Sequence, residues 1–416
     1  MISAAAASKL AFTTTPSTGT AGIPLTALQV AIRDNYGNVV TSNNSTVTIA
    51  VKSGPGGFTS GSTLTAKAVN GVATFNNLIL NTSGTYTFTV TAGALTSATT
   101  GNIVIRAAAA SKLAFTQVPT TGTAGTPLTA LQVAMRDIYG NLVTLNSSII
   151  TIVVKTGPTS SFATGWTLTA TAVNGVATFN NLILNTSGTY TFMATAGATP
   201  ATTGNVVISA AAASKLAFTQ VPTTGTAGTP LTALQVAIRD TYGNVVASNT
   251  SAVTIAVKSG PGGFASGSML TATAVNGVAT FSNLALNTSG TYTFTVTSGS
   301  LTSAATGNIV IRAAAASKLV FTQTPLTGSV NKLLDTMTVS IVDAYGNVTP
   351  TTKLITLSIS SGPSGGNFGP GSVFNVTAVN GVAKFSSIKL AKAGKYTLKV
   401  VAGSLGSAIS GDIDVS

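Results

Sequence analysis

Residues 69–93 read VNGVATFNNLILNTSGTYTFTVTAG, and this stretch holds the local signals that decide the fold. Asn70-Gly71 is the strongest two-residue signal for a tight hairpin turn. After the turn, Tyr86, Phe88 and Val90 alternate with threonine, which is the pattern of a β-strand that buries one face. The stretch therefore predicts short strands joined by tight turns, with aromatic side chains on the buried side.

Landmarks along the chain recur with a period of about 103 residues. The tripeptide SKL begins at Ser8, Ser111, Ser214 and Ser317. A unit of this length is a whole small domain, since solenoid repeats are much shorter. We therefore predict four domains at 8–110, 111–213, 214–316 and a divergent, lysine-rich 317–416, preceded at 1–7 by the strand stub and linker of a missing repeat.

Each repeat has the pattern of an all-β domain. Seven or eight short strands fit into about 100 residues with no helical stretch, which is typical of an immunoglobulin-like Greek-key β-sandwich. A tyrosine follows a glycine-containing corner in every repeat, as in the tyrosine corner of such sandwiches. We assign this structural role to Tyr86, Tyr190, Tyr292 and Tyr396. The alternative is a solvent-facing tyrosine that stacks on a ligand.

Four motifs together resemble a known family. They are SKLAFTxxP, GTAGxPLTALQVAIRDxYGN, VNGVATFxNLxL and GTYTFTVTAG. They are similar to the bacterial immunoglobulin-like domains of tandem-repeat surface proteins, of the invasin and intimin type, across nearly the whole chain. The resemblance implies an extracellular or cell-surface setting in bacteria. It implies no ligand, because no binding motif of that family can be matched here.

The composition excludes most of the residue combinations on which enzyme catalysis depends. The chain has no His, Cys or Glu, so His-based triads, thiol chemistry and Cys/His zinc sites are excluded. Each of the first three repeats has one aspartate, which is too few for paired-carboxylate catalysis or for a calcium site built from several carboxylates. We predict no enzyme activity and no cofactor, and leave open a weak calcium site at the domain junctions.

The aspartates fall in a recurring DxYGN turn. An aspartate in such a turn accepts hydrogen bonds from the turn backbone, and the glycine supplies a positive φ. We predict this structural turn role for Asp34, Asp137, Asp240 and Asp343, and a second one for the Asn70-Gly71 hairpin.

The net charge is +13, with 20 basic residues scattered along the chain. The simplest interpretation is a solvated surface, because no basic cluster with interleaved aromatics suggests specific nucleic-acid binding. The alternative is a surface for acidic partners such as acidic glycans. Its candidates in the last repeat are Lys384, Lys389, Lys392, Lys395 and Lys399.

The repeats are joined by four-alanine linkers such as Ala107–Ala110. Short linkers without glycine or proline restrict swinging between domains, so we expect an elongated array. No run of about 18 apolar residues predicts a membrane span. The opening residues repeat the junction at 208–216, so we expect a chain cut from a longer protein, whose signal and anchor lie elsewhere.

Three functions are compatible with these features of the sequence. The first is a structural or adhesive segment of a bacterial extracellular repeat protein that acts as a stalk, spacer or fibre, with neighbouring repeats as its partners. The second is a carbohydrate- or surface-binding adhesin module centred on the last repeat. The third is a self-assembling filament or surface-layer subunit, formed through exposed strand edges.

Overall fold

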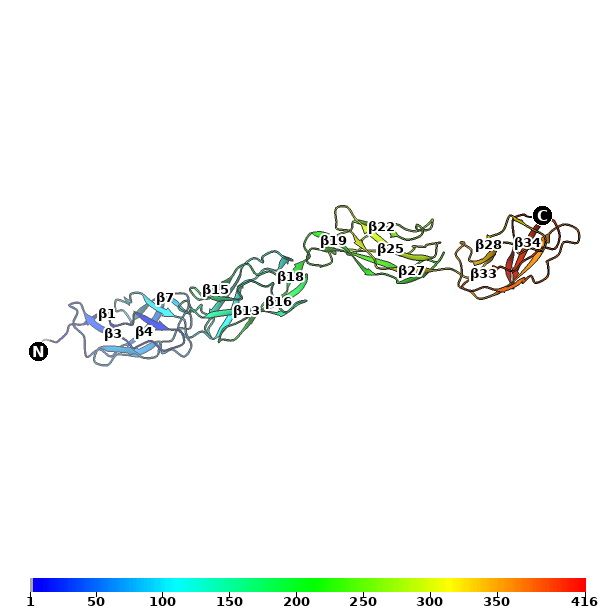
Figure 1. The fold of residues 1–416 in the computed structure, drawn as a ribbon. Coiled ribbons are helices and arrows are strands. Elements are labelled where there is room, and N and C mark those ends of the chain that lie inside the picture. Colours follow the sequence, from blue (N-terminus) through cyan, green and yellow to red (C-terminus); the bar gives the residue numbers. More distant parts are fainter. Residues whose placement is uncertain (1–2) are drawn as a thin grey trace. The chain divides into compact units, whose positions relative to one another are not determined.

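The structure is a computed structural model that describes residues 3–416, and within that range it is all-β without a helix (Figure 1). The chain separates into two compact units, Met1–Ala211 and Ala212–Ser416. Residues 1 and 2 of the predicted stub lie outside the described residues, and Ala7 already belongs to the first strand.

The first repeat has nine strands, two more than the lower sequence-based count. They are β1 (Ala7–Thr14), β2 (Thr18–Thr20), β3 (Leu28–Asp34), β4 (Thr46–Ser53), β5 (Thr65–Lys67), β6 (Val72–Phe75), β7 (Gly84–Thr91), β8 (Ala98–Thr99) and β9 (Ile103–Arg106). One sheet has the order β1-β3-β6, and the other has the order β2-β9-β7-β4-β5 with β8 beside β7. This is the strand order of an immunoglobulin-like Greek-key sandwich.

The higher strand count has a physical cause at Pro16. Proline has no backbone N–H and a fixed φ, so the chain cannot continue its ladder on β3. It crosses to the other sheet, where β2 runs parallel to β9. The first strand of the repeat is therefore divided at Pro16 into β1, in one sheet, and β2, in the other.

The second repeat, in the same unit, has the same two sheets. Its strands are β10 (Lys112–Gln117), β11 (Thr121–Thr123), β12 (Leu131–Arg136), β13 (Ile149–Thr156), β14 (Thr169–Thr171), β15 (Val176–Phe179), β16 (Gly188–Thr195), β17 (Ala201–Thr202) and β18 (Val206–Ser209).

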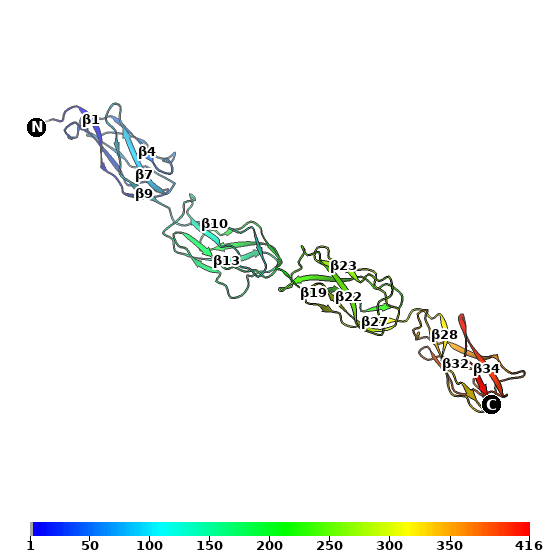
Figure 2. The same cartoon turned by 90° about the horizontal axis from the view of Figure 1, so that it is seen from above.

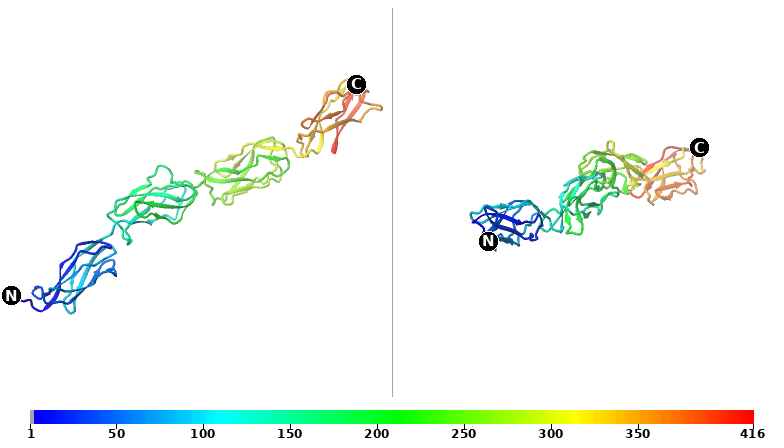
Figure 3. Two further views of the ribbon diagram at one scale, coloured as in Figure 1. Left: turned by 90° about the horizontal axis from the view of Figure 1, so that it is seen from below. Right: turned by 90° about the vertical axis from the view of Figure 1, so that its left-hand side faces the viewer.

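The second unit contains the third and fourth repeats, and Figures 2 and 3 show each of them as its own bundle of strands. The third comprises β19 (Ala213–Gln220), β20 (Thr224–Thr226), β21 (Leu234–Asp240), β22 (Ala252–Ser259), β23 (Thr271–Thr273), β24 (Val278–Phe281), β25 (Gly290–Thr297), β26 (Ala304–Ala305) and β27 (Ile309–Arg312). The fourth comprises β28 (Lys318–Gln323), β29 (Thr327–Gly328), β30 (Met337–Val342), β31 (Leu354–Ser361), β32 (Asn375–Thr377), β33 (Val382–Phe385), β34 (Gly394–Ala402), β35 (Leu405–Ile409) and β36 (Ile413–Val415). In the fourth repeat β35 is longer and pairs with β28, so the two sheets become continuous.

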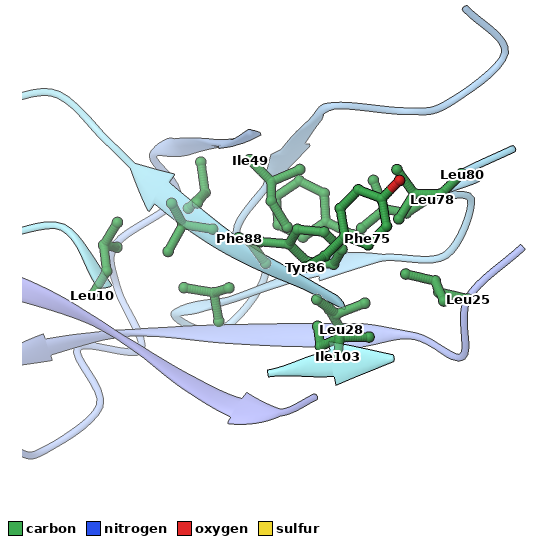
Figure 4. Close-up of a cluster of buried hydrophobic side chains, with 14 of the residues drawn as sticks. Leu10, Leu25, Leu28, Ile49, Phe75, Leu78, Leu80, Tyr86, Phe88 and Ile103 are labelled. Carbon is green, nitrogen blue, oxygen red and sulfur yellow. The ribbon is translucent and has the colours of Figure 1, made fainter. Parts of the chain in front are cut away.

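Each repeat encloses its own hydrophobic cluster between its two sheets. In the first repeat Tyr86 lies among Phe75, Phe88 and Leu28, and all four side chains are buried (Figure 4). The alternation read from the sequence explains this arrangement, because every second side chain of β7 points inward.

The Asn70-Gly71 turn differs from a simple hairpin in one respect. Asn70 and Gly71 have φ of 50° and 77°, and Val69 and Val72 exchange two backbone hydrogen bonds of 2.9 and 3.0 Å, as a two-residue turn requires. The flanking strands β5 and β6 nevertheless lie in opposite sheets. A Cβ on Gly71 would lie 2.6 Å from the Val40 carbonyl oxygen, so the turn is packed against the neighbouring loop while the chain crosses between sheets.

Candidate functional site

The corner tyrosines are structural elements of the core. The Tyr86 hydroxyl donates to the Thr82 carbonyl oxygen at 2.8 Å, and the other three make the same bond four residues back, to Thr186, Thr288 and Lys392. All four rings are fully buried, so none presents a face on which a ligand could stack. Burial raises the pKa of Tyr86 and of Tyr292 above the usual value.

The DxYGN turn is organised by a buried carboxylate. Asp34 is fully buried and accepts four N–H hydrogen bonds of 2.9–3.0 Å. One oxygen accepts from the backbone N–H groups of Tyr36 and Asn38, and the other from the Asn38 side-chain amide and the backbone N–H of Ala5. The Asn38 amide and the three backbone donors lower the pKa of Asp34 to about 2, against the opposing effect of burial.

The fourth of these bonds ties the alanine linker to the domain that follows it. Ala5 is in the linker, and the equivalent Ala108 and Ala314 donate at 2.9 Å to Asp137 and Asp343. In these three cases the linker is therefore anchored to the buried aspartate of the repeat that follows it. This bond has no local sequence signature, because donor and acceptor are 29 residues apart.

The same turn geometry recurs at the other aspartates. At Asp137 and Asp343 burial alone would raise the pKa, but hydrogen bonds from Asn141 or Asn347, from the linker and from the turn backbone outweigh it and lower the pKa. Asp240 accepts from both the backbone N–H and the side-chain amide of Asn244 at 2.8 Å.

The carboxylates of Asp34, Asp137 and Asp343 use their acceptor positions for hydrogen bonds within the protein. A carboxylate offers about four acceptor positions, and in Asp34, Asp137 and Asp343 all four are occupied by N–H donors. No group of three or more acidic or other metal-ligating side chains occurs among residues 3–416. Calcium needs six to eight oxygen ligands, so the turn is built to hold backbone rather than a metal.

In the first unit, this turn also contacts the preceding repeat. The Asn141 side-chain amide donates to the Asn81 carbonyl oxygen at 2.8 Å, and its own oxygen accepts from the Ser83 N–H at 2.9 Å. Asn141 also donates to Asp137, so one side chain joins the linker anchor to the corner of the first repeat.

The tyrosine of the turn completes this contact. The Tyr139 ring lies over Gly22, where a Cβ would overlap its hydroxyl. Tyr139 is 44% exposed, whereas Tyr36 of the first repeat, against which no other described repeat packs, is 85% exposed. The covering of this ring is therefore a consequence of docking between repeats.

The second unit repeats the arrangement between its own two repeats. Asn347 donates to the Asn287 carbonyl oxygen and accepts from the Ser289 N–H, both at 2.7 Å. Tyr345 lies over Gly228 in the manner of Tyr139. We call these contacts, with the linker bond, the junction contacts: Asp137, Asn141 and Tyr139 with their partners in the first unit, and Asp343, Asn347 and Tyr345 with theirs in the second.

The junction contacts were missed by the sequence reasoning, which placed only the aspartates in a structural turn. A signal was present, because each DxYGN motif ends in an asparagine and contains a tyrosine that no core position requires. Their partners lie 58 and 60 residues earlier in the chain, where no periodic pattern points to them.

The five lysines of the fourth repeat are not brought together. Lys384 lies on the outer face of the layer that contains β33, and Lys395 and Lys399 lie on β34, which is in the opposite layer of the same continuous sheet. Lys392 is at the corner and donates to the Ser364 carbonyl oxygen, and Lys389 is only half-buried near the same end. Lys395 forms a 3.0 Å ion pair with Asp412, which raises its pKa. A single basic surface made of all five side chains does not form.

The chain was compared with known proteins. No protein-family profile and no curated protein matches it. Among solved structures it is similar to invasin, a bacterial integrin-binding protein, with 16% identity and a TM-score of 0.32 over 98% of this chain and 79% of that one. It is also similar to the Escherichia coli adhesin FdeC (18%, TM-score 0.36, 76% and 100%) and to domains 4–9 of the surface layer protein SbsC (16%, TM-score 0.24, 99% and 66%).

The assignment of the fold rests on the strand order of each repeat, which defines a tandem array of immunoglobulin-like sandwiches. No helix within the described residues is long and apolar enough to cross a membrane.

Proposed function

We propose that this chain is a segment of an extracellular or cell-surface protein of bacteria, in which the immunoglobulin-like repeats act as a stalk or spacer. The observation that carries the proposal is the set of junction contacts, which occurs between the two repeats of each unit. A spacer needs domains whose mutual orientation is held, and these contacts hold it.

The junction contacts act on both sources of freedom at a domain boundary. The linker is held by the bond from Ala108 to the Asp137 carboxylate, which shortens the free segment between strands. The preceding repeat is held by Asn141 and Tyr139, which contact it away from the linker. Two separate points of attachment resist rotation as well as bending.

The composition supports an exposed setting. The chain has no cysteine that could be oxidised, and only 6% of its residues are charged. Its buried charges are the turn aspartates, and these serve the backbone. The resemblance to bacterial surface repeats points the same way.

The two alternative functions have weaker support. An adhesin centred on the fourth repeat would need a joint surface, but Lys384 and Lys399 lie on opposite faces. Assembly through strand edges would need long free edges. The edge strand β5 has three residues, and β1 is partly covered by backbone bonds of Ser8 and Leu10 with Thr96.

The proposal is tested by measuring a distance across the first junction in the full chain. Because the chain lacks cysteine, Ala50→Cys and Lys155→Cys place one spin label on each repeat at exposed strand positions. We expect a single narrow distance distribution. A broad distribution, of the kind that a free linker produces, would refute the stalk proposal.

The elongated array expected from the linkers stays a prediction. Small-angle scattering of the full chain tests it, and a compact particle would contradict it.

A further inference from the structure

The two ends of a repeat in this chain carry different surfaces. The finishing end of a repeat is the end of the folded domain that faces the next repeat. It carries a glycine, Gly22 in the first repeat and Gly228 in the third, that leaves room for the tyrosine of the next repeat. These glycines have φ of 76° and 71°, a conformation that favours glycine and otherwise asparagine. The starting end is the opposite end of the domain, which faces the preceding linker. It carries the tyrosine and asparagine of the DxYGN turn.

The fourth repeat departs from this pattern at its finishing end. Asn331 occupies the position of Gly22: its N–H donates to the Leu390 carbonyl oxygen at 2.8 Å, as that of Gly22 does to Leu80 at 2.9 Å. Its φ of 58° shows that the backbone is also similar. Asn331 has a Cβ, which stands where the tyrosine hydroxyl lies at the other junctions.

The first repeat keeps a complete docking surface at its starting end. Asp34 holds the turn in the same way as Asp137, and Asn38 takes the place of Asn141. Tyr36 is 85% exposed and Asn38 is exposed as well, whereas Asn141 is half-buried and Asn347 is 8% exposed. The surface formed by Tyr36 and Asn38 is therefore preformed and uncovered.

We propose that glycine at the position of Gly22 decides which repeat end can receive another repeat. Under this rule the starting end of the first repeat accepts an immunoglobulin-like repeat that finishes in such a glycine, and the finishing end of the fourth repeat, with Asn331, accepts none. A second copy of this chain therefore does not dock head to tail through its fourth repeat. The inference rests on the junction role proposed above.

The occupant is a repeat tethered in the same polypeptide. Two hydrogen bonds and one ring contact make a small interface, which is too weak to hold free partners at ordinary concentrations. A four-residue linker raises the effective concentration to the millimolar range, which favours docking within one chain.

The first test uses the full chain with the label pair at positions 50 and 155. Gly22→Asn keeps a residue that tolerates the local backbone, as Asn331 shows, but adds the Cβ that meets Tyr139. We expect the narrow distribution to broaden on the order of 10 Å, the excursion of a free four-residue linker. The matched control is Gly93→Asn, at φ 53° with open space around it, which should leave the distribution narrow.

The second test adds a repeat to the full chain. A copy of residues 107–209, which includes Gly125 and Tyr139, is placed either before Ala4 or after Ser416, with a cysteine pair across the new junction. We expect a narrow distance distribution when the repeat is added before Ala4 and a broad one when it is added after Ser416. In the chain extended after Ser416, Asn331→Gly should make the distribution narrow.

The outcomes separate the two proposals. If the unmodified junction is broad, the stalk proposal fails. If it is narrow and Gly22→Asn leaves it narrow, the glycine rule fails while the stalk proposal stands. A broad distribution for the repeat added before Ala4, or a narrow one after Ser416 with Asn331 present, would also overturn the rule.

Discussion

Replacing Asn141 by alanine removes the side chain that connects the first two repeats. The structure gives it two hydrogen bonds across the junction, to Asn81 and Ser83, at 2.8 and 2.9 Å. At about 0.5–1.5 kcal/mol for each hydrogen bond, the pair contributes about 1–3 kcal/mol to docking. This corresponds to a loss of about 5- to 150-fold in the ratio of docked to undocked junctions.

Hydrogen exchange at the Ser83 amide detects this change, because Asn141 is the acceptor of that N–H and its removal leaves the amide without a partner. In the full chain with Asn141→Ala, we expect exchange at Ser83 to accelerate by at least about 5-fold, because the loss of the acceptor adds to the loss of docking. Amides in the centre of β7 should keep their protection, since the core of the first repeat is not altered.

The matched control is Asn38→Ala. Asn38 makes the same bond to Asp34 that Asn141 makes to Asp137, at 3.0 and 2.8 Å, but it bonds to no other repeat among the described residues. It therefore reproduces the change within the turn and leaves the junction intact. Unchanged exchange at Ser83 in Asn141→Ala, or equal acceleration in Asn38→Ala, would refute the assignment of docking to Asn141.

Three further predictions follow from the turns and corners. Because the folded-state pKa of Asp34 is about 2 and that of an unfolded aspartate is about 3.9, stability should be complete above about pH 5 and fall as the pH drops toward 2; thermal unfolding followed by circular dichroism checks this, and a midpoint that is constant from pH 6 to 2 would contradict it. Tyr86→Phe removes the bond to Thr82 and should lower the free energy of unfolding of the first repeat by about 0.5–1.5 kcal/mol, read from hydrogen exchange within that repeat, with no change expected in the third. Calcium and EDTA should both leave the unfolding temperature unchanged, because N–H donors occupy the acceptor positions of Asp34 and Asp137; a rise with calcium in calorimetry would show that a cation displaces them.

Several features of the fold could be predicted from the sequence because their causes lie within a few neighbouring residues. Alternation of apolar and polar residues predicted the strands, and Asn-Gly predicted the turn at Asn70. The strand count was low because the division of the first strand at Pro16 depends on which sheet can accept the chain, and that is a property of the assembled sandwich.

The sequence by itself determined four repeats of an immunoglobulin-like sandwich, the buried corner tyrosines and the aspartate-centred turns. These follow from period, alternation and turn chemistry within a few residues of each other. Only the tertiary structure decided that Asp34 also holds Ala5, that Asn141 reaches the corner at Ser83, and that Lys384 and Lys399 face opposite ways. The two hydrogen-bonded pairs are 29 and 58 residues apart, so they meet only after two sheets have packed and one repeat has been placed against the next.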